Sequence, residues 1–154
     1  MPNLVFFRIL LQTGEYIMGL VYENITLKNA TDVGNSVRGI IQEGEVRQIK
    51  VLAMVDTGAE TLVINEAMRQ ELGLTVIGER RVGLANNYGE MCQFTEPVMI
   101  YWKDRPAVTH AIVLPGATEV LLGAIPLEEM NVMIDPRSQQ LVGIHGDEII
   151  YKVK

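Results

Sequence analysis

The chain is poor in the residues that hold metals or form covalent cross-links: its 154 residues include one cysteine and two histidines. The single cysteine, Cys92, excludes an internal disulfide and fits a reducing, cytoplasmic location. Cys92, His110 and His145 lie in unrelated segments without the spacing of metal ligands, so we expect no metal site. No sequence signature accompanies Cys92 that would make it a nucleophile.

Basic residues and long apolar runs are also scarce. The chain has 13 Lys and Arg against 19 Asp and Glu, a net charge of −6. The basic residues are scattered and form no stripe with aromatic residues, so we expect no nucleic-acid partner. The apolar run over 4–11 is too short to span a bilayer and is interrupted by Arg8, so we expect no membrane partner. It also lacks the flanks of a signal peptide.

The length of 154 residues indicates one domain with a real hydrophobic core, at 48% hydrophobic and 21% charged residues. The run over 4–11 is either a buried or partner-covered strand or part of an extension, because Met18 opens a fresh, domain-like segment. We therefore divide the chain into an N-terminal extension of uncertain status (1–17) and a single domain (18–154) with its core at 37–145.

Short apolar runs separated by turn residues predict a mainly β chain. The expected strands cover residues 19–27, 37–42, 46–55, 80–85, 90–94, 97–102, 108–114, 120–123, 132–134 and 141–144, with a turn over 28–32. The clearest helix covers 65–74, with Asn65 as its N-cap and Gly73 at its end, and a shorter helical segment covers 125–131. Many short strands and little helix indicate an all-β sandwich or closed barrel.

The run from Ala53 to Ile64 carries the most informative motif. An apolar strand delivers Asp56 into a turn of small residues, and a second apolar run follows at once. An ionised aspartate between apolar segments is costly unless the fold gives it hydrogen bonds. Thr57 can supply a hydroxyl, Gly58 permits close backbone approach, and Ala59 leaves space beyond the carboxylate. The alternative is a turn aspartate that caps its own loop.

One carboxylate in an apolar setting cannot easily act as both acid and base, but two carboxylates can. Like charges about 3 Å apart cannot both ionise, so the pair shares one proton. The ionised member then activates a water while the protonated member donates to a carbonyl. This arrangement hydrolyses an amide without a metal or a covalent intermediate.

Asp56-Thr57-Gly58-Ala59, with its apolar flanks, resembles the active-site strand and loop of retropepsin-like aspartic proteases. Two further segments occur in the order of that family. Residues 82–92, with Asn86-Asn87-Tyr88-Gly89 at the tip, lie where a flap hairpin is expected, and Leu121-Leu122-Gly123 precedes a short helix. The resemblance covers residues 37–145 and is closest to small single-domain proteases of prokaryotic type. It implies a closed all-β acid-protease barrel with one or two short helices.

The resemblance implies a role for each residue of the motif. Asp56 would be catalytic, Thr57 would brace the active-site loops of two copies, and Gly58 would support the approach of substrate. Ala59 and Glu60 would line the substrate site, although Glu60 is equally consistent with an intersubunit salt bridge or a plain exposed acid. The flap would bind substrate through Leu84, Ala85, Asn86, Asn87, Tyr88 and Gly89. Tyr88 could close over the substrate or simply be an exposed aromatic residue.

The chain contains a single Asp-Thr-Gly, so the resemblance implies a homodimer in which a second copy supplies the other aspartate. Asp135 is not followed by Thr-Gly, and we interpret it as part of a turn between two strands. Residues 147–154 would interleave across the dimer, with a disordered tail as the alternative.

The favoured function is an aspartic endopeptidase that acts on peptide or protein substrates and needs no cofactor. The alternative is a protease-fold module that binds peptides or dimerises but cleaves weakly or not at all. An unrelated β-barrel binding protein is a third possibility.

Overall fold

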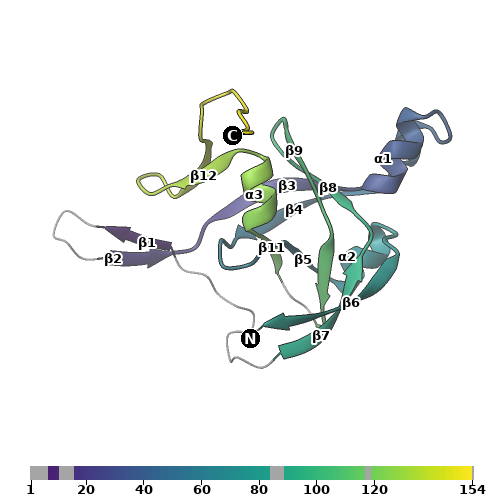
Figure 1. Cartoon of the computed structure of the whole chain (residues 1–154), viewed down its shortest axis with the longest axis horizontal. Helices are drawn as coiled ribbons and strands as arrows, with labels where there is room; N and C mark the ends of the chain where they lie inside the picture. Colours follow the sequence, from purple (N-terminus) through teal and green to yellow (C-terminus); the bar gives the residue numbers. More distant parts are fainter. Residues whose placement is uncertain (1–6, 11–15, 84–88, 117–118, 154) are drawn as a thin grey trace.

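The computed structural model describes residues 7–10, 16–83, 89–116 and 119–153, with side chains from Leu20 onward (Figure 1). The predicted all-β fold with short helices is confirmed. The strands are β1 (Phe7–Leu10), β2 (Tyr16–Gly19), β3 (Tyr22–Asn29), β4 (Gln48–Val55), β5 (Leu62–Asn65), β6 (Val76–Gly83), β7 (Gly89–Thr95), β8 (Val98–Trp102), β9 (Arg105–Thr109), β10 (Ala111–Leu114), β11 (Val120–Leu122), β12 (Val132–Asp135) and β13 (Gln140–Gly143). The helices are α1 (Ala30–Val37), the 3-10 turn η1 (Glu43–Glu45), α2 (Glu66–Glu71) and α3 (Ala124–Glu129).

Nine strands form one curled sheet in the order β6-β7-β10-β5-β11-β4-β3-β8-β9 (Figure 1). In its middle, β11 runs parallel to β4 and antiparallel to β5, while β10 runs parallel to β5. Two small hairpins, β1–β2 and β12–β13, lie outside this sheet. The order brings β4 and β11 side by side, although their paired residues Val55 and Leu122 are 67 positions apart in the sequence.

The central strands bury side chains on both of their faces, as expected for strands covered on two sides. On β4, Ala53 and Val55 belong to the main core, whereas Met54 between them belongs to a second cluster. Val63 on β5 and Leu121 on β11 lie in the second cluster with Met54. This second cluster consists of Met54, Val63, Cys92, Ile112 and Leu121, with Leu20, Val82, Phe94 and Leu114 packed against it.

The segment between β3 and β4 differs from our prediction. We expected a turn over 28–32 and a strand over 37–42. Instead helix α1 covers Ala30–Val37, residues 38–42 form no strand, and β4 begins only at Gln48. The Asn29 side chain caps the helix by accepting from the Asp32 amide at 3.1 Å. The predicted strand over 108–114 is also divided, because the chain leaves the β8–β9 hairpin at His110 and enters the middle of the sheet as β10.

Most other local predictions are confirmed. Asn65 caps α2 by accepting from the Met68 amide at 2.9 Å, and Gly73 follows the helix with φ of +61°. The hairpins β6–β7, β8–β9 and β12–β13 pair as expected. Met18 lies within β2, and the division of the chain at residue 17 stays a prediction. Among the described residues, no helix is both long and apolar enough to span a membrane.

Candidate active site

Asp56 lies at the end of β4, where the strand meets the active-site loop, residues 57–61. Its backbone amide donates to the Leu122 carbonyl of β11 at 2.9 Å, which continues the pairing of the two strands. The residue is only 1% exposed. Because side chains alternate along a strand, Asp56 lies on the same face of β4 as Met54 and the second cluster.

The loop supplies the hydrogen bonds that a buried carboxylate needs. The amides of Gly58 and Ala59 donate to Asp56 Oδ1 at 2.9 and 3.1 Å. Within the described part of the chain, no hydrogen bond reaches the other carboxylate oxygen, Oδ2. One oxygen is therefore held by the loop, and the other is left for a proton, a water or a second carboxyl group.

Burial raises the pKa of Asp56 above its ordinary value, and the two hydrogen bonds from Gly58 and Ala59 only partly offset this. Among the residues described, no neighbouring carboxylate contributes to the shift. The raised pKa of Asp56 is thus that of a single acid in an apolar setting. A second carboxylate placed beside Oδ2 would raise the affinity of the pair for one shared proton further.

The beginning of α3 holds the other side of the active-site loop. The amides of Ala124 and Ile125 donate to the carbonyls of Ala59 and Glu60 at 2.8 and 2.9 Å. Gly123 lies between β11 and α3, and a Cβ there would lie 2.3 Å from the Thr61 carbonyl oxygen. Glycine is therefore required at this position by close contact with the loop.

The structure places the predicted loop residues together. Thr57, Gly58 and Glu60 are exposed, and Ala59 is partly buried. Gly58 and Ala59 act here through their amides, which contact the Asp56 carboxylate directly. The bracing role of Thr57 and the substrate contacts of Ala59 and Glu60 stay predictions.

The predicted flap lies only partly within the described residues. Strands β6 and β7 form its two sides, and Gly89 begins β7 opposite Gly83. Val82 of β6 packs against the second cluster, which is on the face that carries Asp56. The predicted substrate contacts Leu84, Ala85, Asn86, Asn87 and Tyr88 lie outside the described residues.

The sequence assigned no site role to three residues near Asp56: Leu20, Thr61 and Gly123, of which Gly123 was named only within the Leu121-Leu122-Gly123 pattern. The Val55 amide donates to the Val21 carbonyl at 2.8 Å, and the β3–β4 register pairs Tyr22 with Met54. Continued by two residues, this register sets Leu20 opposite Asp56. Only the pairing of β3 with β4, which no local pattern encodes, could have identified Leu20.

Two other candidates from the sequence have structural roles. Asp135 accepts from the Arg137 amide and the Ser138 hydroxyl, each at 3.0 Å, which confirms its interpretation as a turn residue. Cys92 is 2% exposed, and burial, with a smaller effect of Glu90, raises the pKa of its thiol, which disfavours the thiolate. The described residues contain no group of three or more His, Cys, Asp or Glu side chains that could hold a metal ion.

Comparison with protein families finds a match over the segment that contains Asp56. Residues 42–95 match the family model described as aspartyl protease, a stretch that includes β4, Asp56, the active-site loop and the β6–β7 hairpin. None of the curated proteins compared with the chain matches it. The predicted resemblance to retropepsin-like aspartic proteases is confirmed.

The chain is also similar to several solved structures. The retroviral protease-like domain of Ddi1 from Leishmania major matches with a TM-score of 0.50 at 19% identity, over 84% of this chain and 90% of that one. A retropepsin-like aspartic protease from Rickettsia conorii matches with a TM-score of 0.47 at 19% identity, over 85% of each chain. EIAV protease in complex with the inhibitor HBY-793 matches with a TM-score of 0.45 at 24% identity, over 53% of this chain and 77% of that one.

Proposed function

We propose that this chain is an aspartic endopeptidase that works as a homodimer, with Asp56 of each copy forming one catalytic pair. The observation that carries the proposal is the buried Asp56 carboxylate, whose Oδ1 is held by two loop amides while Oδ2 accepts none from the described residues. The match of this segment to the aspartyl protease family supports the assignment.

The requirement for two copies follows from the chemistry and the sequence together. The chain has one Asp-Thr-Gly, and no other described carboxylate perturbs Asp56. Two Asp56 side chains about 3 Å apart would share one proton. The ionised carboxylate would take a proton from water as the water attacks the peptide carbonyl, and the protonated one would donate to the carbonyl oxygen.

The proposed substrate is an extended peptide lying between the active-site loop and the β6–β7 hairpin. Such a peptide is bound mainly by its backbone, and alternate side chains enter pockets on the two sides. In this proposal Ala59, Glu60 and the hairpin residues from Leu84 to Gly89 contact the substrate. Thr57 braces the two active-site loops, and Gly58 lets the substrate approach closely. No cofactor takes part in this chemistry.

The decisive experiment compares Asp56→Asn with Asp104→Asn, which changes an exposed aspartate in the β8–β9 turn. A peptide library is digested from mildly acidic to neutral pH, with and without a statine-type transition-state mimic. We expect cleavage by the parent and by Asp104→Asn, inhibition by the mimic, and no cleavage by Asp56→Asn. Full activity of Asp56→Asn would refute the mechanism. A folded parent protein that cleaves nothing at any pH would support the peptide-binding alternative.

A mixing experiment tests the shared site directly. Parent and Asp56→Asn chains are combined in equal amounts and allowed to exchange subunits, with the total chain concentration unchanged. If both aspartates are required, about a quarter of the parent activity remains, because only that fraction of dimers has two parent subunits. About half would remain if each chain acted alone, and that result would refute the homodimeric site.

A further inference from the structure

The junction between β9 and β10 contacts the active-site loop through Thr61. The Thr61 hydroxyl donates to the His110 carbonyl at 2.8 Å, and its oxygen lies 2.7 Å from the Thr109 hydroxyl oxygen. A hydroxyl has one hydrogen to donate, so the Thr109 hydroxyl is the donor to Thr61. Thr61, the last residue of the loop that begins after Asp56, is thus held by two hydrogen bonds from one short segment.

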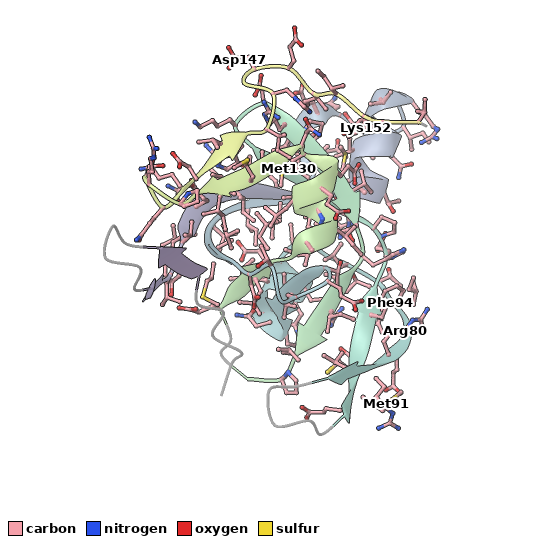
Figure 2. All side chains as sticks on the ribbon, turned by 60° about the vertical axis from the view of Figure 1, so that its left-hand side comes forward. Arg80, Met91, Phe94, Met130, Asp147 and Lys152 are labelled. Carbon is pink, nitrogen blue, oxygen red and sulfur yellow. The ribbon has the colours of Figure 1, made fainter. Side chains whose placement is uncertain are left out.

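The same junction contacts the β6–β7 hairpin through the His110 side chain. The His110 ring centroid lies 4.5 Å from that of Phe94 on β7, with the rings tilted by 33°. His110 Nδ1 lies 2.8 Å from the Thr95 carbonyl oxygen, so Nδ1 carries the proton and donates. The Cζ atom of the Arg80 guanidinium on β6 lies 4.3 Å from the Phe94 ring centroid. Figure 2 shows the two side chains next to each other on the hairpin.

His110 can make both contacts because the strand is interrupted there. β9 pairs with β8 at one edge of the sheet, whereas β10 pairs with β5 and β7 in its interior. The residue between them leaves the ladder of β8, so its carbonyl is free to accept from Thr61. Its ring then lies against β7. One residue therefore joins the active-site loop to the hairpin that would cover the substrate.

We propose that Thr61 and His110 are positioning residues for the peptide hydrolysis proposed above. Thr61 fixes the far end of the loop so that the Gly58 and Ala59 amides stay directed at Asp56 Oδ1. His110 fixes the base of the hairpin to the same point. The proposal rests on the proposed function for its catalytic consequence, but the order that Thr61 imposes on the loop can be measured without catalysis.

The primary test replaces Thr61 with valine, which keeps the shape of the side chain and removes the hydroxyl. Thr61→Ser restores the hydroxyl. Thr31→Val is the matched control, because Thr31 lies on α1 and the change removes its hydroxyl hydrogen bond to Glu96 instead. We expect kcat of Thr61→Val to fall about ten- to a hundredfold with little change in KM, since small displacements of catalytic groups have effects of this size. Thr61→Ser should recover most of kcat, and Thr31→Val should keep it.

Amide hydrogen exchange of Gly58 and Ala59 supplies the readout that does not depend on activity. Both amides are hydrogen-bonded to Asp56, and we expect Thr61→Val to speed their exchange about tenfold while Thr31→Val leaves it unchanged. For the hairpin, His110→Phe keeps a ring against Phe94 but loses the bond to Thr95. It should raise KM more than it lowers kcat.

Each outcome decides the proposal. Unchanged exchange at Gly58 and Ala59 in Thr61→Val would overturn it, and so would faster exchange with an unchanged kcat. If the parent protein cleaves no peptide, the proposed function fails, and the exchange result alone decides whether Thr61 orders the loop. If Thr61→Val does not fold, Thr109→Val replaces it, because that change removes the donor to Thr61 and leaves the bond to His110 in place.

Discussion

Replacing Gly123 with alanine is expected to disturb the active-site loop directly. A Cβ at this position would lie 2.3 Å from the Thr61 carbonyl oxygen, 2.7 Å from the Ala59 carbonyl oxygen and 2.8 Å from the Thr61 amide nitrogen. The Gly123 backbone, with φ of −90° and ψ of −175°, is open to any residue. The cost is therefore steric, and backbone atoms cannot move aside as a flexible side chain can.

The size of the effect follows from these three contacts. Inserting a methyl group into a tightly packed site costs about 1–3 kcal/mol. Because the new Cβ would make three backbone contacts under 3.0 Å, we expect Gly123→Ala to lower the free energy of unfolding by about 3 kcal/mol. For a domain of this length, that loss lowers the melting temperature by about 6–12 °C. Relief of the clash must separate α3 from the loop and weaken the bond from the Ala124 amide to the Ala59 carbonyl.

Thermal denaturation and peptide cleavage, measured on the same preparation, test this reasoning. Gly44→Ala is the matched control, because a Cβ at Gly44 has no described atom within 4 Å and its φ is not positive. We expect Gly44→Ala to keep the parent melting temperature and activity. Gly123→Ala should lose both stability and cleavage. A Gly123→Ala variant with the parent melting temperature and full activity would show that the loop and α3 are not packed as described.

Three further predictions concern charged groups. Because burial raises the pKa of Asp56, the folded protein binds this proton more tightly than the unfolded chain does. The contribution of Asp56 to the free energy of unfolding is therefore present below the unfolded pKa and is lost as pH rises through the folded pKa. Asp56→Asn should therefore melt higher than the parent at pH 7 but not at acidic pH, and a lower melting temperature at pH 7 would contradict this. Arg47 lowers the pKa of Asp32, so Asp32→Asn should cost about 1–2 kcal/mol at pH 7 in denaturant unfolding, with less difference from the parent as pH falls through the folded pKa. The buried Arg105 donates to three backbone carbonyls, so Arg105→Met should lower the free energy of unfolding by about 2–4 kcal/mol, whereas exposed Arg137→Met should have almost no effect; equal effects would refute this.

The parts of the fold that the sequence predicts are those with local causes. Asn65 before a run of helix formers and Gly73 after it mark the ends of α2, because capping bonds and a positive φ involve only neighbouring residues. The turn at Asp135 is equally local. Apolar strands around a small-residue turn likewise identified the Asp56 segment without reference to the rest of the chain.

Helix α1 shows where local reasoning fails. Its N-cap Asn29 has the same chemistry as Asn65, but the residues after it are also common in turns. Residues remote in the sequence stabilise the helix. Arg47 donates to Asp32 through its side chain at 2.8 and 2.9 Å and through its backbone amide at 3.0 Å. Asn29 also donates to the Leu72 carbonyl at 3.0 Å. No window of sequence around residues 28–37 contains these partners.

The same distinction applies to the active site. The motif predicts Asp56 as the reactive acid, but the surroundings of this residue come from segments far along the chain. The Leu122 carbonyl accepts from the Asp56 amide, Gly123 leaves room for the active-site loop, and Thr109 donates to the end of that loop. These contacts exist only once β11 lies beside β4 and β10 beside β5. They hold the loop amides on Oδ1, whereas no described residue donates to Oδ2. The described residues thus order one carboxylate oxygen of Asp56 and donate nothing to the other, and our proposal places the Asp56 carboxyl group of a second copy beside that second oxygen.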